Sequence, residues 1–354
     1  MTDERRSRRA ARRRPAILLA VIFGVASPAA HAAEFALASD QVLVGAAGEY
    51  VTRDEDTLLD VARKNDLGYG QLIAVNPGID PWLPRAGQRI VLPTLYLLPD
   101  GERRGIVINL AEHRLYFFVP EDATVETYPI GIGVEADMTP LGTTQVIGKD
   151  VQPSWYPPPS IRAERPELPE VVPPGPDNPL GQFSLRLGWT NYRIHGTNKP
   201  YGVGRHVSHG CIRLYPEDIA QLFPKVAVGT PVRVIEEPIR LAWVENELYL
   251  AVAPSRRQLD QIAIDEPVTP DVPYDLVDRV VAAAGNQVRR VDWHLVGQIG
   301  LKRPGMPVRI TMPSPPPDDS LDVTAPSETS GHPVAALPVA GWTVNLAGGC
   351  GPSY

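Results

Sequence analysis

Residues 194–198 read Ile-His-Gly-Thr-Asn, and residues 208–214 read Ser-His-Gly-Cys-Ile-Arg-Leu. The second stretch places Cys211 two residues after His209, and the first supplies another imidazole, that of His195. The thiolate is the attacking form of cysteine, and a neighbouring imidazole can take the thiol proton and later return it to a leaving amine. These residues predict a nucleophilic cysteine, with either histidine as its base.

Small and polar residues around this cysteine suit the binding of a substrate. Gly196 and Gly210 each follow a histidine, and glycine lets the backbone come close to a bound molecule. The N–H groups around Gly210 and Cys211 are candidates for an oxyanion hole. Arg213 either forms a surface ion pair or holds a substrate carboxylate.

A zinc site is the alternative interpretation of the same segment. Imidazole and thiolate are the usual zinc ligands, and the spacing along the chain does not exclude a shared metal. A zinc hydrolase of this kind would lose its activity to a chelator. The four candidate ligands are His195, His206, His209 and Cys211. Taken singly, His206 and His113 are interpreted as structural residues.

The region 103–235 has the pattern of an all-β sandwich or barrel. Short β-branched or aromatic runs alternate there with turn residues. After the cysteine, residues 216–223 predict one short helix and residues 232–235 a closing strand. Residues 153–179 hold ten prolines and predict a long surface loop, because proline lacks the N–H that a central strand needs. The predicted earlier strands cover residues 106–110, 114–119, 126–133, 142–147, 183–187 and 192–194.

The regions on either side of this domain are predicted to have different structures. Residues 49–94 predict a small β-α-α-β unit whose first helix follows Asp56 or Thr57 as its N-cap. Residues 33–48 are interpreted as a linker, and residues 236–312 as an accessory region with a helix over 273–284. Residues 313–354 are proline-rich and are expected to be disordered. Cys350 lies in that glycine-rich tail, so no disulfide with Cys211 is expected.

Residues 1–32 have the order of a signal peptide. Seven arginines lie within residues 1–14, an apolar run follows over 16–26, and Ala30-His-Ala32 matches a cleavage box. The apolar run is too short to span a bilayer. Removal of residues 1–32 leaves 27 basic and 39 acidic residues, so the net charge falls from −7 to about −12. Such an acidic chain is a poor ligand for phosphate backbones, which excludes nucleic acid as the expected partner.

The motifs at residues 194–198 and 208–214 resemble the signature of the L,D-transpeptidase catalytic domain. Further segments fall in the order and spacing of that family, and the similarity covers about residues 49–250. The small N-terminal unit resembles a LysM carbohydrate-binding module, and the whole is most similar to the periplasmic branch that attaches Braun lipoprotein to peptidoglycan. The further matching segments are 130–133, 139–142, 153–158, 178–181 and 193–195.

The resemblance implies a mainly β catalytic domain in which Cys211 is the nucleophile and His195 the proton donor and acceptor. His209 and Ser208 then support the thiolate and its loop, and the 153–179 segment is a candidate lid. The implied reaction joins a peptidoglycan tetrapeptide stem, through a cysteine thioester, to a second stem or to a lysine-ended lipoprotein. With water as acceptor the enzyme would be a carboxypeptidase or amidase. The resemblance implies no metal or organic cofactor, sensitivity to carbapenems, and a periplasmic location without a membrane span.

Overall fold

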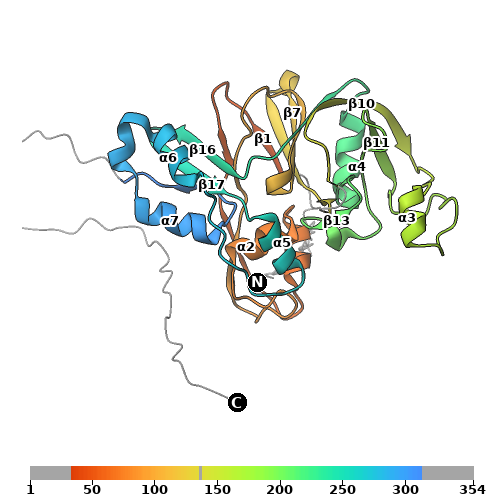
Figure 1. Ribbon diagram of the computed structural model, residues 1–354, viewed down its shortest axis with the longest axis horizontal. Coiled ribbons are helices and arrows are strands. Elements are labelled where there is room, and N and C mark those ends of the chain that lie inside the picture. Colours follow the sequence, from red (N-terminus) through yellow and green to blue (C-terminus); the bar gives the residue numbers. More distant parts are fainter. Residues whose placement is uncertain (1–32, 135–137, 313–354) are drawn as a thin grey trace, which may run out of the picture. The chain divides into compact units, whose positions relative to one another are not determined.

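The computed structural model describes residues 33–134 and 138–312 of the chain. The predicted signal peptide, the predicted tail and Cys350 lie outside these residues. The fold is mainly β, as predicted (Figure 1). Within the described residues no helix has both the length and the apolar character that crossing a bilayer requires.

A nine-stranded sheet forms the centre of the chain, with the order β1-β8-β7-β6-β15-β10-β11-β12-β14. The strands β6, β7 and β8 form an antiparallel meander, and β15 pairs in parallel with β6 and antiparallel with β10. The strands expected between residues 103 and 235 are present, except that the predicted strand 126–133 is divided between β8 and β9, and β13 and β14 were not predicted. Their bounds are β6 (Gly105–Asn109), β7 (Arg114–Val119), β8 (Thr124–Pro129), β10 (Gly142–Val151), β11 (Phe183–Leu187), β12 (Arg193–His195), β14 (Ile212–Arg213) and β15 (Pro231–Ile235), with β9 (Ile132–Gly133) and β13 (His206–Ser208) as a separate pair.

Both faces of the central strands are covered, which explains why these strands are apolar almost throughout. Side chains alternate between the two faces of a sheet. Ile108 and Leu115 therefore enter one core cluster, while Val107 and Tyr116 enter another on the opposite face. Each such buried aliphatic side chain contributes about 1.5–3 kcal/mol relative to an exposed one.

Helix α4 (Pro216–Lys225) packs on the larger core cluster, as its apolar spacing predicts. Pro216 occupies the first helical position, where the missing N–H costs no hydrogen bond. Ile219 and Leu222 are fully buried in the core, and the helix contacts β11 (Figure 1). This helix anchors the chain directly after the cysteine motif.

The β-α-α-β unit is present over the predicted residues. Its strands β3 (Gly48–Val51) and β4 (Arg89–Leu92) pair antiparallel, and between them lie α1 (Leu58–Lys64) and α2 (Tyr69–Val75). Thr57 caps α1, because its side chain accepts a hydrogen bond from the Asp60 N–H at 3.1 Å. Leu58, Leu72 and Ile90 form its own small core.

Residues 33–48 are not the linker that the sequence predicted. They contain β1 (Ala33–Ala36), which pairs with β8, and β2 (Leu43–Gly45), which pairs with β5 (Leu95–Leu97). Val44 is 1% exposed within a core cluster. Both strands are short and find their partners far along the chain, so their own residues carry little strand pattern.

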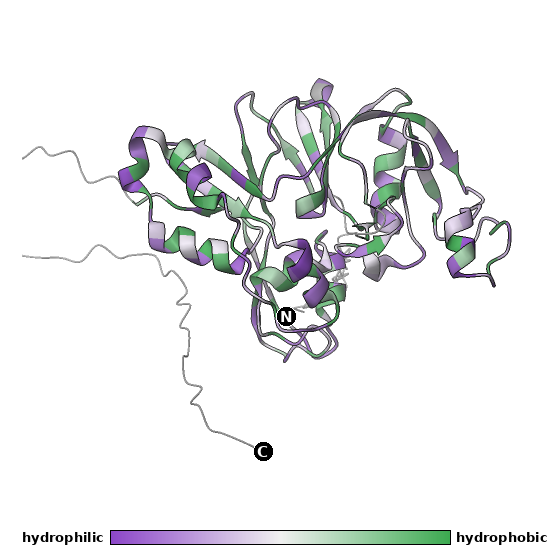
Figure 2. Cartoon of the chain, viewed as in Figure 1, coloured by the Kyte–Doolittle hydropathy of each residue, from purple (hydrophilic) through white to green (hydrophobic). Residues whose placement is uncertain are grey.

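Residues 236–312 form a second apolar core of their own. The predicted helix over 273–284 is observed as α6, which begins at Leu276, and Figure 2 shows hydrophobic and hydrophilic residues alternating on α7. Elements of this region are β16 (Ile239–Val244), β17 (Glu247–Val252), β18 (Val308–Arg309), α5 (Arg256–Ala263), α6 (Leu276–Ala284) and α7 (Trp293–Lys302). A short 3-10 helix in this region covers Gly285–Arg290. Three others lie in the catalytic region, at Leu110–Glu112, Pro120–Asp122 and Pro200–Gly202.

The proline-rich segment 153–179 contains more regular structure than predicted. It holds the short helix α3 (Pro159–Glu164), which begins at a proline, and a bridge between Trp155 and Val172. The buried amide of Asn178 donates to the carbonyl oxygens of Pro153, Val172 and Pro173, at 2.8, 3.2 and 3.1 Å. This side chain closes the base of the loop and so fixes its path.

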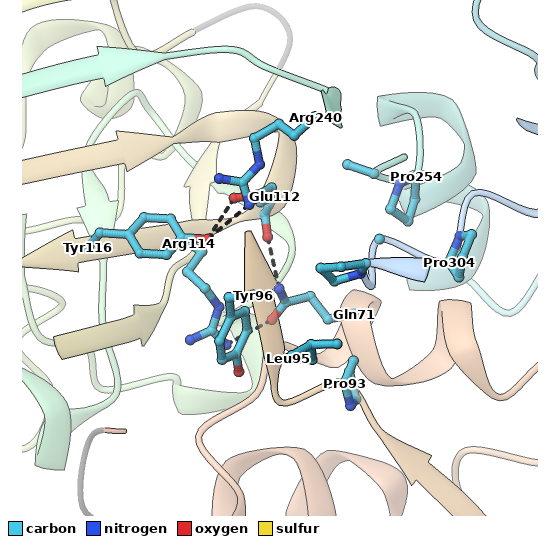
Figure 3. A pocket seen from close by; sticks show the side chains of 13 residues that line it. Gln71, Pro93, Leu95, Tyr96, Glu112, Arg114, Tyr116, Arg240, Pro254 and Pro304 are labelled. Atoms are coloured by element: carbon cyan, nitrogen blue, oxygen red, sulfur yellow. Dashed lines mark hydrogen bonds and ion pairs between the residues drawn. The ribbon is translucent and has the colours of Figure 1, made fainter. Parts of the chain in front are cut away.

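A small pocket of about 20 Å³ lies where the β-α-α-β unit, the sheet and the C-terminal region meet (Figure 3). Arg240 forms an ion pair with Glu112, which also accepts a hydrogen bond from the Tyr116 hydroxyl at 2.9 Å. Gln71 of α2 donates to the Glu112 carbonyl and accepts from Arg114, both at 3.1 Å. Side chains of the three regions are thus joined by buried polar contacts.

Candidate active site

The pairing of β12 with β14 brings His195 and Cys211 to one place in the sheet. The two strands run parallel, with His195 opposite Arg213 and Ile194 opposite Ile212. Cys211 directly precedes β14, two positions before Arg213, and side chains two positions apart share a face. His195 and Arg213 therefore share one face of these two strands, and the period of two places the Cys211 side chain toward the same side. The charge of Arg213 acts on the pKa of both other residues, which agrees with this placement.

His195 is a neutral imidazole, and one of its two nitrogens is hydrogen-bonded to the backbone. Burial lowers its pKa to about 3, and the charge of Arg213 acts in the same direction. The Nδ1 atom lies 2.6 Å from the carbonyl oxygen of Gly196, so Nδ1 carries the hydrogen and donates it. The lone pair is then on Nε2, the nitrogen that can accept a proton.

Cys211 is a free, half-buried thiol. Its sulfur lies 3.5 Å from the carbonyl oxygen of Asn191, to which the thiol can donate. Burial raises the thiol pKa, although the positive charges of Arg213 and Arg193 oppose this. The resting pair is therefore a neutral thiol and a neutral imidazole, and the sulfur loses its proton as it attacks.

The loop before Cys211 is fixed by hydrogen bonds within the predicted motif. The Ser208 hydroxyl donates to the Cys211 carbonyl at 2.6 Å, and Thr139 donates to the Gly210 carbonyl at 2.8 Å. Gly210 has φ +93°, a conformation that other residues adopt only with strain. Within the described part of the chain, the N–H groups of Gly210 and Cys211 donate to no backbone carbonyl. This leaves both as candidate oxyanion donors.

Gly196 makes two hydrogen bonds through its backbone at this site. Its N–H donates to the Phe183 carbonyl at 3.1 Å, and its own carbonyl accepts from His195. A Cβ here would lie 3.0 Å from Ile219. Gly196 therefore orients the imidazole through its carbonyl oxygen.

Arg213 carries a charge that no acidic side chain balances among the described residues. The residue is half-buried, and its Nε atom has no hydrogen-bond partner in the described chain. Burial lowers its pKa. Buried charges are usually paired, so an unpaired guanidinium beside a nucleophile suits a substrate carboxylate.

His209 lies on the exposed side of the loop. Its Nε2 atom is 4.0 Å from a carboxylate oxygen of Glu164, at the end of α3. The proline-rich segment therefore reaches the cysteine loop, as the candidate lid would. His209 is placed to contact this segment, whereas His195 is the buried imidazole.

His206 and His113 form a separate cluster. Their Nε2 atoms lie 3.2 Å apart, and His206 Nδ1 lies 2.7 Å from a carboxylate oxygen of Asp260. His206 thus turns to α5 and away from the other predicted zinc ligands. Across residues 33–134 and 138–312, no three His, Cys, Asp or Glu side chains are grouped closely enough to hold a metal ion.

Three residues of the site carry no signal in the sequence that marks them as site residues. Asn191 offers only its carbonyl, and any residue type supplies one. Thr139 and Asn178 occur within the matched segments 139–142 and 178–181, but only the structure shows which atoms they hold. An alignment of related sequences would have been needed to select them.

Comparison with known proteins identifies the family of this chain. The family profile of the YkuD L,D-transpeptidase catalytic domain matches residues 103–234. An Escherichia coli K12 protein named "Probable L,D-transpeptidase YcfS" is 45% identical over 204 residues, which cover 55% of this chain and 64% of that protein. The K12 proteins named "Probable L,D-transpeptidase ErfK/SrfK" and "Probable L,D-transpeptidase YbiS" are 37% and 38% identical, over 76% and 70% of this chain and 87% and 81% of their own lengths. The chain therefore belongs to the L,D-transpeptidase family.

Proposed function

We propose that this protein is a cysteine L,D-transpeptidase in which Cys211 attacks the stem peptides of peptidoglycan and His195 moves the proton. The observation that supports the proposal is the pairing of β12 with β14, which sets His195 opposite Arg213, two residues along the chain from the free thiol of Cys211. Family membership supplies the substrate class.

The first half-reaction acylates the cysteine. The Cys211 sulfur gives its proton to His195 Nε2 and attacks the carbonyl that joins the third stem residue to the terminal D-alanine. The N–H groups of Gly210 and Cys211 hold the oxyanion, and Arg213 holds the D-alanine carboxylate. His195 then protonates the departing amine, the C–N bond breaks, and a thioester remains.

The second half-reaction transfers the acyl group. An acceptor amine gives its proton to His195 and attacks the thioester, and the sulfur leaves and recovers the proton. With a second stem as acceptor the product is a 3–3 cross-link, and with a lysine-ended lipoprotein the product is a protein anchored to the wall. Water as acceptor would instead give carboxypeptidase or amidase activity.

The β-α-α-β unit is proposed to be a LysM-like module that binds the glycan. Its α2–β4 loop presents two large apolar side chains, Trp82 and Leu83, which are 51% and 75% exposed. Asp80 holds this loop by accepting hydrogen bonds from both N–H groups, at 2.9 and 3.0 Å. Exposed aromatic side chains of this kind are common at binding surfaces. Loss of binding to purified cell walls in Trp82→Ala would support this role.

The N-terminal arginine-rich segment and its Ala30-His-Ala32 box support export and removal of residues 1–32. The proposed location is the periplasm, where peptidoglycan lies. A lysine-ended outer-membrane lipoprotein is the proposed second partner beside the stems.

The decisive experiment incubates the mature protein with purified tetrapeptide muropeptides, with and without a lysine-ended lipoprotein peptide. Mass spectrometry distinguishes cross-linked dimers, peptide adducts and simple loss of D-alanine. We expect dimers or adducts, and a covalent carbapenem adduct visible by intact mass, all absent in Cys211→Ala. Activity that survives in Cys211→Ala but is lost to a chelator would overturn the proposal in favour of a metal hydrolase.

A further inference from the structure

Two buried carboxyl groups lie together away from the catalytic residues. Asp66 follows α1, and Asp218 lies in the first turn of α4; their exposed fractions are 7% and 3%. Burial raises the pKa of both, to about 7 for Asp66, and the neighbouring Asp66 charge raises the pKa of Asp218 further. Buried carboxyl groups are rare without a cation beside them.

One buried cation, Arg114, faces the two acids, and a hydrogen bond between Asp66 and Asp218 acts on the Asp66 pKa as well. Arg114 is fully buried and donates to the Asp66 carbonyl at 3.0 Å, so it supplies one positive charge for two acids. Arg63 is bound to Glu217 through two hydrogen bonds, at 2.6 and 2.8 Å. Within the described residues, Asp66 Oδ1 and Asp218 Oδ2 have no hydrogen-bond partner. The remaining titratable neighbours are Tyr96, Tyr128 and Tyr215, whose raised pKa values keep them uncharged at neutral pH.

The backbone nitrogen of Ala33 lies at this acidic pair. It donates to Asp66 Oδ2 at 3.1 Å. Strand β1 begins at Ala33 and places it opposite Thr127, whose hydroxyl accepts a hydrogen bond from Arg114 at 2.9 Å. Ala33 is also the first residue after the Ala30-His-Ala32 cleavage box.

We propose that Asp66 and Asp218 form a buried receptor for the α-ammonium group that is created when the chain is cut between Ala32 and Ala33. The inference rests on the proposed removal of residues 1–32. In that step water adds across the Ala32–Ala33 peptide bond, so Ala32 keeps a carboxylate and Ala33 gains an amine. An α-amino group has an ordinary pKa of about 7.7–8.0, and a nearby carboxylate favours its charged form.

The cut changes the chemistry at one atom that is already in place. Before the cut, the Ala33 nitrogen offers one neutral N–H; after it, the same nitrogen offers three N–H donors and a positive charge. The ion pair would join three elements: β1, the turn after α1, and α4. Because α4 directly follows the Cys211 loop, the mature terminus would brace the segment that holds the nucleophile.

The test compares two mature chains that differ only at this terminus. One begins at Ala33, and the other carries an added glycine and serine before Ala33, which restores a peptide bond there. Intact mass of the protein purified after export first gives its natural terminus. We expect it to begin at Ala33 and to melt about 3–8 °C above the extended chain at pH 7.

Two further measurements separate an ion pair from a general effect of extra residues. The difference in melting temperature should shrink by pH 10, because the α-ammonium loses its charge above its raised pKa. It should also shrink in Asp66→Asn, but not in the matched control Asp54→Asn, whose side chain is exposed. If Asp66→Asn does not fold, the pH comparison of the two chains decides alone.

The outcomes distinguish the two linked proposals. A natural terminus at another residue overturns both the predicted cut and the receptor. A chain that begins at Ala33 but melts at the same temperature as the extended chain overturns the receptor alone.

Discussion

Arg240, which is buried, and Arg213, which is half-buried, lie in different electrostatic settings. Arg240 is paired with Glu112 in the pocket of Figure 3, where three regions meet. Arg213 lies near Cys211 and forms no ion pair with an acidic side chain of the described chain, although both arginines have guanidinium nitrogens without a hydrogen-bond partner there. Paired buried charge stabilises a packed junction, whereas unpaired buried charge is costly and persists where a ligand will neutralise it. The contrast supports the proposal that the substrate carboxylate binds beside Cys211.

The largest effect should come from the residue that moves the proton. His195→Ala should lower the rate of thioester formation by about 10²–10⁴-fold, the usual contribution of a positioned general base. Stopped-flow acylation by a carbapenem measures this rate. His209→Ala is the matched control, and a loss as large as that of His195→Ala would reverse the two roles.

The pH dependence of acylation tests the same assignment of His195 as the base. Because the His195 pKa lies at about 3, the base stays neutral as the pH falls below neutrality. Acylation by wild-type protein should therefore change little between pH 7 and 5.5, where an ordinary imidazole would lose about tenfold of its neutral form. A tenfold fall over that range, with the protein still folded, would contradict a depressed pKa.

A substitution in the pocket of Figure 3 should change the free energy of unfolding and not the rate of acylation. Arg240→Gln leaves Glu112 buried without its cation, and we expect a loss of about 3–5 kcal/mol in the free energy of unfolding. Urea denaturation measures it. The control is Arg279→Gln, which removes a more exposed pair with Asp275 and should cost less than about 1 kcal/mol. Equal losses would remove the distinction between the two kinds of pair.

Arg213→Gln should show the converse behaviour. We expect kcat/KM for a stem ending in D-alanine to fall about 10–100-fold, corresponding to about 1.4–2.7 kcal/mol, because a charged hydrogen bond to the carboxylate is lost. The free energy of unfolding should not fall, since no buried partner is left behind. With a stem whose terminal carboxylate is amidated, Arg213→Gln and the wild type should have similar values of kcat/KM.

The smallest effect is expected where α3 meets the cysteine loop. Glu164→Gln removes a partly exposed charge 4.0 Å from His209, and surface pairs of this kind contribute little. The turnover rate should change less than about twofold, as in the neighbouring control Glu167→Gln. A tenfold change would mean that this contact governs the lid.

The sequence predicted best those elements whose own side chains carry the pattern. The strands β6 and β7 and the helix α4 lie where apolar spacing places them, and residues 195 and 211 lie in motifs long enough to be recognised. Prediction failed for β1 and β2, because their partners β8 and β5 are distant in sequence and the strands are too short to show alternation. It also could not show that the Gly196 N–H binds the Phe183 carbonyl, because that carbonyl is brought there only by folding.

The order of the sheet has a consequence for how the protein assembles. Strand β15 is the last strand of the catalytic region to be synthesised, yet it lies between β6 and β10 in the middle of the sheet. Until residues 231–235 insert, the half that carries the nucleophile contacts the half built earlier through the Gly131–Arg213 bridge and the β9–β13 pair, but not through the middle of the sheet. Pairings between such distant segments form slowly. We therefore expect the catalytic face to be completed late in folding, because a chain that stops short of β15 lacks the strand that joins β6 to β10.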